Sequence, residues 1–222
     1  MTQSDRAYTE GNPTRGSTKA AYTHRSDAVR VHADDYPTPP GFVWPLLDHL
    51  QLPPETRVWD PCAGGGHLVN SLRQRFDTVL FQDLLYSGDD FLTRPPPAVW
   101  GEYADWIVTN PPYKHADDFI HQALSQVSNV AMLFNAGFLE GIRRIEGLFT
   151  EEPPSQVLLC MRKMKLSDGR QSVFAHVWVV WELNHEGPIR WDWLRNTHDL
   201  QMPTGYRTDV WPEGAKEDAD VE

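Results

Sequence analysis

The sequence has few cysteines, no long apolar run and a shortage of basic residues. Only two of its 222 residues are cysteines, Cys62 and Cys160, which is too few for a disulfide framework. No apolar stretch approaches the roughly 20 residues that a membrane-spanning helix needs. Residues 1–6 also lack the apolar core of a signal peptide. We therefore expect a protein of a reducing cytoplasm that has no membrane partner.

The charge of the chain is strongly negative and unevenly spread. A formal net charge of −11 argues against a general nucleic-acid coat, because affinity for phosphates depends on clustered Lys and Arg. The last ten residues carry five acids against Lys216 alone, which predicts a solvated acidic tail. Residues 161–170 are instead locally basic and suit a phosphate contact, with a solvated loop as the equal alternative. The basic residues there are Arg162, Lys163, Lys165 and Arg170.

Length and composition predict one main domain with two appendages. Residues 1–32 are rich in Thr, Ser, Gly and charge and poor in aliphatic side chains, which favours a flexible N-terminal arm. The main domain is then expected at residues 33–200, and the acidic C-terminal tail at 201–222.

From residue 56 onward, apolar runs of strand length alternate with helical spacing of apolar residues. Strands are predicted at 56–60, 78–82, 106–108, 129–134, 157–161 and 175–181. Helices are predicted at 41–50, 67–75, 116–127 and 138–149, and Thr38 is expected to cap the first. This alternation implies an α/β fold with a doubly wound, mostly parallel sheet and helices on both faces.

The predicted strand at 106–108 ends in Asn110-Pro111-Pro112-Tyr113. In open α/β sheets, ligands bind outside the carboxyl ends of the strands. Asn110 would give that crevice an amide acceptor, and Tyr113 would give it a stacking surface. The structural alternative is a rigid loop and no more.

The predicted strand at 56–60 leads into Pro61-Cys62-Ala63-Gly64-Gly65-Gly66. Three consecutive glycines let the backbone pass close to a ligand, and the helix that follows points its free N–H groups at the same place. The loop is neither a GxGxxG dinucleotide motif nor a phosphate-binding P-loop. A tight strand-to-helix turn would use glycine for structural reasons alone.

Acids follow the second predicted strand. Asp83 would face the same crevice as the glycine loop and could accept hydrogen bonds from both hydroxyls of a ribose. Asp90 could hold an adenine amino group, and Phe91 could pack on the purine face. A surface acid and a core phenylalanine are the plainer interpretation of that pair.

Together, Asp60 to Gly66 and Asn110 to Tyr113 resemble the class I S-adenosylmethionine-dependent amino-methyltransferases, above all the DNA adenine N6-methyltransferases. Upstream, Tyr36 to Pro39 resembles their amino-terminal cofactor-contacting element. The resemblance covers about residues 34–183. It implies a Rossmann-like methyltransferase fold in which the main domain is catalytic.

The resemblance also implies S-adenosylmethionine as cofactor. Its methionine part would lie against Asp60 and the glycines, its ribose at Asp83, and its adenine at Asp90 and Phe91. The full set of cofactor contacts implied is Tyr36, Thr38, Asp60, Ala63, Gly64, Gly65, Gly66, Asp83, Asp90, Phe91 and Asn110.

The implied catalytic residues are Asn110, Pro111, Pro112 and Tyr113. An exocyclic amine is a poor nucleophile because its lone pair is delocalised into the ring. The side-chain oxygen of Asn110 and the carbonyl of Pro111 would accept its two hydrogens and direct the lone pair at the methyl group. Substrate contacts are expected from Tyr113, Lys114, Arg162, Lys163, Lys165 and Arg170. We expect no metal, because the methyl donor is already a charged sulfonium.

The expected substrate is adenine N6 in DNA, with a phage-like enzyme working in a bacterial or phage-infected cytoplasm. A protein glutamine N5-methyltransferase or an RNA adenine N6-methyltransferase is the alternative, and a non-catalytic binding subunit is the third hypothesis. The chain is short for a separate target-recognition region. Specificity would therefore be low, or it would come from a specificity subunit or a homodimer, or from residues 1–32, 138–154 or 162–170.

Overall fold

The computed structural model describes residues 37–93, 104–161, 174–195 and 210–211. The chain divides into two compact units, residues 1–33 and 34–222. The first unit, and with it the predicted arm at 1–32, lies outside the described residues. Every described residue belongs to the second unit.

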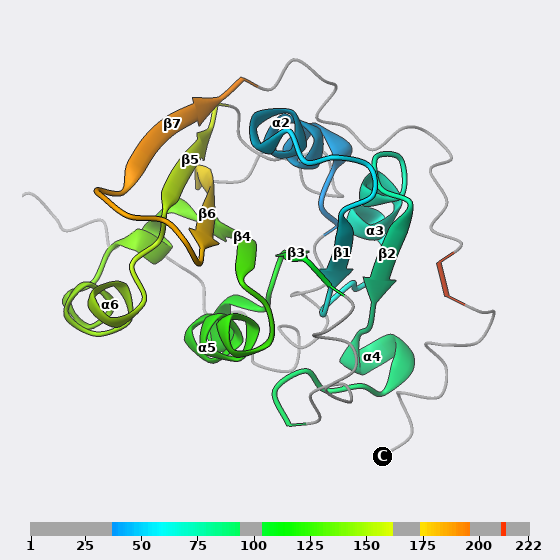
Figure 1. Ribbon diagram of the computed structural model, residues 1–222. Coiled ribbons are helices and arrows are strands. Elements are labelled where there is room, and N and C mark those ends of the chain that lie inside the picture. Colours follow the sequence, from blue (N-terminus) through cyan, green and yellow to red (C-terminus); the bar gives the residue numbers. More distant parts are fainter. Residues whose placement is uncertain (1–36, 94–103, 162–173, 196–209, 212–222) are drawn as a thin grey trace, which may run out of the picture. The chain divides into compact units, whose positions relative to one another are not determined.

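Seven strands form one sheet in the second unit (Figure 1). They are β1 Arg57–Asp60, β2 Thr78–Phe81, β3 Trp106–Thr109, β4 Asn129–Asn135, β5 Gln156–Cys160, β6 His176–Glu182 and β7 Arg190–Leu194. Six of them lie where the apolar runs predicted strands. The seventh, β7, was not predicted, because four of its five residues are exposed and it has no apolar run.

The strand order across the sheet is β2-β1-β3-β4-β6-β5-β7. Strands β2, β1, β3 and β4 run parallel to one another, and β7 runs parallel to β5. Only β6 is reversed, because it pairs antiparallel with both β4 and β5. The predicted mostly parallel α/β sheet is therefore confirmed.

Helices cover both faces of the sheet, as predicted. They are α2 Pro40–Leu50, α3 His67–Leu72, α4 Leu84–Ser87, α5 Ala116–Gln126, α6 Ile142–Glu146 and α7 Leu148–Glu151, with 3-10 turns η2 Tyr113–His115 and η3 Ala136–Leu139. One core joins α2 and α3 to a sheet face that includes Val58. The other joins α5 and α7 to the opposite face, which includes Trp59. Consecutive strand residues thus enter separate cores, as the two-residue period of a strand requires.

The predicted capping of α2 by Thr38 is wrong. The residue before the helix is Pro39, no side chain caps it, and Pro40 occupies its first turn. A proline suits that position because its missing N–H would have no helical partner there. The hydroxyl of Thr38 is used elsewhere, in the site described below.

The single helix predicted at 138–149 is broken into η3, α6 and α7. Gly141 has a φ of 124°, a backbone conformation open almost only to glycine, and Gly147 separates α6 from α7. Ile142 and Ile145, which fitted the helical spacing, are 63% and 51% exposed. The apolar periodicity is present in the sequence, but Gly141 and Gly147 interrupt the helix that it predicts.

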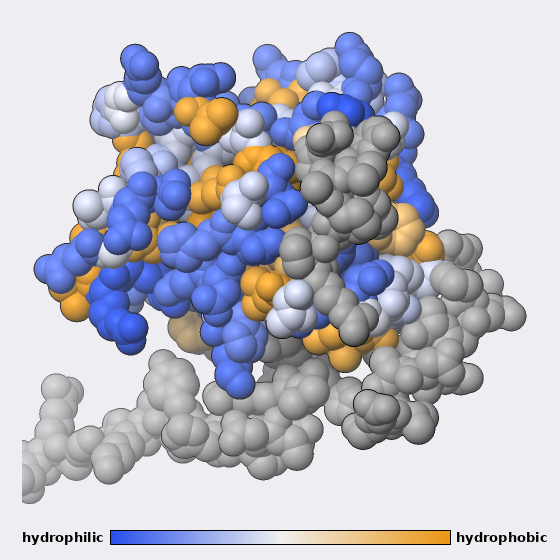
Figure 2. Space-filling model, turned by 60° about the horizontal axis from the view of Figure 1, so that its bottom comes forward, coloured by the Kyte–Doolittle hydropathy of each residue, from blue (hydrophilic) through white to orange (hydrophobic). Residues whose placement is uncertain are grey.

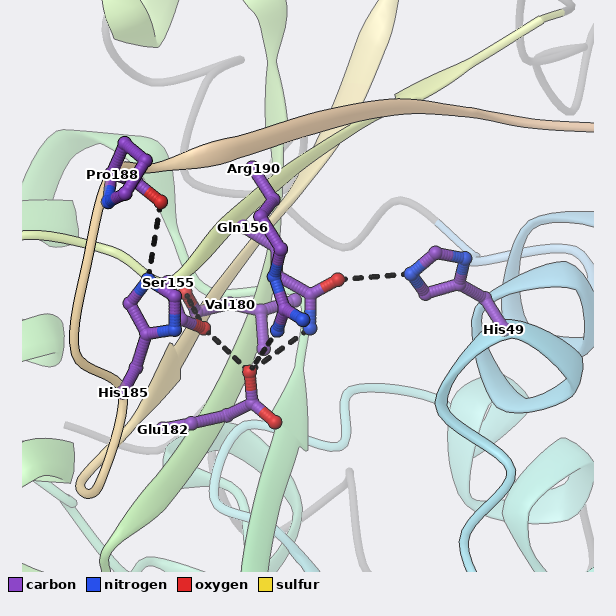
Figure 3. A network of polar contacts seen from close by, with 8 residues as sticks. All are labelled: His49, Ser155, Gln156, Val180, Glu182, His185, Pro188 and Arg190. Carbon is purple, nitrogen blue, oxygen red and sulfur yellow. Dashed lines mark hydrogen bonds and ion pairs between the residues drawn. The ribbon is translucent and has the colours of Figure 1, made fainter.

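A half-buried carboxylate, that of Glu182, joins the amino-terminal ends of β5 and β7 to the end of β6 (Figure 3). One oxygen of Glu182 accepts hydrogen bonds from Ser155 at 2.8 Å, Gln156 at 3.0 Å and Arg190 at 3.1 Å. Burial alone would raise the pKa of Glu182, but these hydrogen bonds and the charge of Arg190 outweigh it and lower the pKa. His49 of α2 contacts Gln156 at 2.9 Å and ties the helix to this network. The network stabilises the end of the sheet opposite to the site.

Hydrophobic side chains also reach the surface. On the face shown in Figure 2 they form patches among hydrophilic residues. Trp191 and Trp193 on β7 are 63% and 64% exposed. Within the described residues, no helix has the length and apolar character to cross a membrane.

Removing a side chain from the central strand should test this core directly. Leu133 of β4 is fully buried among α2 and neighbouring strands. Leu133→Ala should lower the free energy of unfolding by about 2–5 kcal/mol, because it leaves a cavity. The matched change Leu183→Ala, at a side chain that is 71% exposed, should stay within about 0.5 kcal/mol. Urea unfolding measures both, and equal losses would contradict the assignment of the core.

Candidate functional site

The carboxyl ends of three parallel strands meet at one edge of the sheet. Asp60 is the last residue of β1, Asp83 follows β2 by two positions, and Asn110 follows β3 directly. Side chains at this edge are linked across strands, because Thr109 bonds to Asp60 and Gly64 bonds to Asp83. The structure thus brings together the glycine loop and the Asn-Pro-Pro-Tyr segment.

Asp60 is a buried acid at the centre of this edge. It is 1% exposed, and its Oδ1 accepts hydrogen bonds from the hydroxyl of Thr109 at 2.6 Å and from the backbone N–H of Cys62 at 3.3 Å. Its other oxygen is buried without a hydrogen-bond partner among the described residues. Burial raises the pKa of Asp60 to about 7, although the bonds from Thr109 and Cys62 act to lower it. The site therefore contains an acid that changes charge near neutral pH.

Cys62 packs inside the same loop. Its Sγ lies 2.8 Å from the hydroxyl of Thr109 and 3.5 Å from the carbonyl oxygen of Asn110. Burial and the nearby charge of Asp60 raise the pKa of the thiol well above its usual value. A thiol held in its neutral form is a poor nucleophile, so Cys62 serves as a small packing residue.

The acid at Asp83 holds backbone groups on both sides of it. Its Oδ2 accepts from the N–H of Gly64 at 2.8 Å, and its Oδ1 accepts from the N–H of Leu85 at 2.8 Å, which caps α4. The side chain thereby fixes the glycine loop to the start of α4. The predicted contact of Asp83 with a ribose stays a prediction.

Asn110 presents an acceptor that nothing in the described chain satisfies. Its side-chain N–H₂ donates to the hydroxyl of Thr38 at 3.1 Å, and Thr38 is itself 3% exposed. Its side-chain oxygen is buried and has no hydrogen-bond partner among the described residues. Thr38 therefore sets the direction of the Asn110 amide, and the free oxygen is left for another donor.

The residues after Asn110 are packed against the domain. Pro111 is buried, Pro112 is half-buried, and Tyr113 begins η2. The Tyr113 ring lies against Phe134 of β4, with ring centroids 6.0 Å apart at 48°. This support fixes the position of a half-buried aromatic ring next to Asn110, while Lys114 is exposed.

The pair Asp90 and Phe91 lies beyond α4. Asp90 accepts hydrogen bonds from the hydroxyl of Thr93 at 2.7 Å and the N–H of Leu92 at 3.0 Å, and the Thr93 bond is the main cause that lowers its pKa. The Phe91 ring is 2% exposed and packs against Trp59 and Phe119. This is the core phenylalanine that the sequence left as the alternative, and its ring has almost no surface for a purine.

Sequence reasoning overlooked one polar residue at this edge. Gln82 follows β2, is 2% exposed, and its side-chain nitrogen is buried with no hydrogen-bond partner in the described part of the chain. Its backbone N–H donates to the carbonyl of Asp60 at 3.1 Å. An amide that ends an apolar run is the same signal that identified Asn110, but here it was counted as part of the strand.

Several predicted site residues cannot be placed. Tyr36 and the basic residues Arg162, Lys163, Lys165 and Arg170 lie outside the described residues. Within the described ranges, no three His, Cys, Asp or Glu side chains gather in an arrangement that could hold a metal ion.

Comparison with known proteins gives structural similarity only. No family model matches the sequence, and no curated protein matches it. The structure is similar to the methyltransferase subunit of a type I restriction-modification system from Streptococcus thermophilus, with a TM-score of 0.53 at 15% identity over 71% of this chain and 47% of that one.

Two further solved structures are similar at lower scores. A protein of Vibrio vulnificus assigned as a type I restriction enzyme modification subunit has a TM-score of 0.49 at 14% identity, over 75% of this chain and 50% of that one. A Listeria monocytogenes protein assigned to the class I S-adenosylmethionine-dependent methyltransferases has a TM-score of 0.47 at 12% identity, over 72% and 67%. The chain spans about half the length of the two restriction-modification subunits.

The raised pKa of Asp60 predicts how the stability of the protein depends on pH. Because its pKa is raised to about 7, the folded state binds its proton more tightly than the unfolded state does. The stability that this group contributes is present at pH 4 and is lost as the pH rises through 7. Relative to Asp60→Asn, the wild type should therefore lose stability between pH 4.5 and pH 8, on the order of a few kcal/mol.

Urea unfolding of both proteins at these two pH values measures the difference. Asp77→Asn removes an acid at an exposed position and serves as the control. If the stability of Asp60→Asn and wild type follows the same pH curve, Asp60 does not titrate in this range.

With the sheet order, the helices on both faces and the similarity to the S. thermophilus subunit established, the described part of this chain has the fold of the class I methyltransferases.

Proposed function

We propose that this protein is an S-adenosylmethionine-dependent methyltransferase that modifies an exocyclic amine, N6 of adenine in DNA. The observation that carries the proposal is the side-chain oxygen of Asn110, a buried acceptor without a partner among the described residues, at the carboxyl end of β3. Buried polar atoms are nearly always hydrogen-bonded in proteins, so an unmatched acceptor favours a site for a ligand donor. An amine with two hydrogens is such a donor.

The residues at the ends of β1 and β2 fit the cofactor. When bound, S-adenosylmethionine supplies a methyl group on a positively charged sulfur. The unmatched oxygen of Asp60 suits the ammonium group of the methionine part, and the unmatched side-chain nitrogen of Gln82 suits its carboxylate. A nearby ammonium would favour the charged form of Asp60 and return its pKa toward the ordinary range. Asp83 would take the ribose and Asp90 the adenine.

The Asn110 segment is suited to hold the target amine. Asn110 and the carbonyl of Pro111 would each accept one amine hydrogen, which directs the nitrogen lone pair to the methyl group. Thr38 keeps the Asn110 amide turned so that its oxygen stays available. The nitrogen proton can leave after transfer, so no side chain has to act as a general base.

Tyr113 would stack on the target base. A base inside a duplex must first leave the stack, which costs a few kcal/mol. A ring already supported by Phe134 offers stacking at little further cost in conformational freedom.

DNA is favoured over other substrates by the motifs and by the kind of protein that the structure resembles. The Asn-Pro-Pro-Tyr motif is also similar to that of glutamine N5-methyltransferases and of some RNA adenine methyltransferases. The net charge of −11 is the observation on the side of a protein substrate. A non-catalytic subunit is disfavoured, because the segment from Asn110 to Tyr113 is intact. The similar S. thermophilus protein is a subunit, which fits a role for a partner in target recognition.

A transfer assay separates these substrates. The full chain is incubated with radiolabelled S-adenosylmethionine and, in separate reactions, with duplex DNA, structured RNA or a release factor that carries the glutamine. Label is expected in DNA, and nucleoside mass analysis should identify N6-methyladenine. Label that enters only the release factor would show that the DNA assignment is wrong.

Asn110→Ala should reduce transfer by at least about a hundredfold, in the range seen when a positioned transition-state contact is lost. Its effect on cofactor affinity should be small, because the Asn110 oxygen faces the target amine. Transfer rate and the Kd for S-adenosylhomocysteine measure the two effects separately. Asn184→Ala removes an exposed asparagine in the turn after β6 and should change neither. If cofactor binding is lost in the Asn110 variant, Asn110 belongs to the cofactor site instead.

A further inference from the structure

Two residues from the far end of the chain contact the glycine loop. The indole N–H of Trp211 donates to the carbonyl of Gly64 at 2.8 Å, across 147 residues of sequence. The N–H of the same glycine donates to Asp83 at 2.8 Å. Both backbone polar groups of Gly64 are thus held by side chains, one 19 residues and one 147 residues later in the chain. Gly64 itself has a φ of 51°, in the left-handed region.

The Trp211 ring is seated on aromatic neighbours that flank Asp83. It stacks on Tyr86 of α4, with ring centroids 5.5 Å apart at 16°. It also meets the edge of Phe81 of β2, at 5.1 Å and 76°. Aromatic pairs in these geometries stabilise one another beyond the area they bury. Trp211, which donates to Gly64, therefore packs against β2 and α4, the elements on either side of Asp83.

Val210 packs against the glycine loop and α3. It is 9% exposed and packs with Ala63 of the loop and Val69 of α3. A Cβ added at Gly66 would lie 1.9 Å from a methyl carbon of Val210. Gly66 therefore has to be glycine for two reasons, its φ of 81° and the presence of Val210.

We propose that Trp211 is a positioning residue for the cofactor site: Val210 and Trp211 hold the glycine loop in the conformation that binds S-adenosylmethionine. The inference rests on the proposed function. A run of three glycines loses more backbone freedom on ordering than any other sequence. If a contact already orders the loop in the free protein, less conformational entropy is lost when the cofactor binds.

The contact acts as a support and not as a competitor for the cofactor. Val210 is buried among loop and helix side chains, which is the packing of a core. The hydrogen bond from Trp211 uses one of the two lone pairs of the Gly64 carbonyl, so the second stays available to a ligand. Loss of Trp211 should therefore weaken cofactor binding.

The test compares two variants of the full-length chain with a matched control. Trp211→Phe keeps an aromatic ring but removes the N–H donor, and Trp211→Ala removes both. Isothermal titration with S-adenosylhomocysteine should show affinity lower by about three- to tenfold in Trp211→Phe, the range of one hydrogen bond, and lower still in Trp211→Ala. Trp191→Phe changes a tryptophan that is 63% exposed on β7 and should bind as the wild type does.

Hydrogen exchange separates positioning from general stability. Amides of residues 61–68 should exchange faster in Trp211→Phe, while those of α5 should not change. Unchanged affinity in a folded Trp211→Phe, tighter binding, or faster exchange throughout the domain would each overturn the proposal. If the wild type binds no S-adenosylhomocysteine, the proposed function itself fails, and this result is distinct from wild-type binding that Trp211→Phe leaves unaltered.

Discussion

The site depends on one hydrogen bond, between the hydroxyl of Thr109 and the buried carboxylate of Asp60. At 2.6 Å it joins the carboxyl ends of β1 and β3, two adjacent parallel strands. The glycine loop leaves the sheet directly after Asp60, and Asn110 leaves it directly after Thr109. The bond therefore sets the distance between the two segments to which the proposed function assigns cofactor and substrate.

Burial of the Asp60 carboxylate at this position lowers the free energy of unfolding. Burying a charge costs free energy unless it is fully paired, and one oxygen of Asp60 has no partner among the described residues. An apolar residue at the end of β1 would satisfy the sheet at lower cost. Unmatched polar atoms at Gln82 and Asn110 occur at the ends of the two neighbouring strands. Three of the unmatched buried polar atoms of the described residues thus lie at one edge of the sheet.

Much of the fold could be predicted because strand signals in a parallel sheet are local. The runs that became β3 and β4 are continuously apolar, since both of their faces are buried. The strand β7 could not be found this way, because Trp191 and Trp193 alternate with charged residues and remain exposed. The helix predicted at 138–149 failed because periodicity ignores what Gly141 requires of its backbone.

The sequence also allowed several residues of the candidate site to be proposed, and their roles stay predictions. Asp60, Gly64 and Asn110 could be proposed because each follows a recognisable strand. Thr38 was assigned to the site, but its use as a partner for Asn110 depends on a contact across 72 residues. Trp211 and Gly64 are even further apart in the sequence, by 147 residues, and no sequence period relates two residues at such a separation. Such contacts are fixed by tertiary packing, which a pattern in one segment does not encode.

The position of Trp211 in the chain has a consequence for the order of events during synthesis. The seven strands of the described residues precede it, and Gly64 is made 147 residues earlier. At about 5–20 residues per second, the glycine loop would wait roughly 7–30 s for its last native contact. The contact of Gly64 with Asp83 can therefore form before the contact with Trp211.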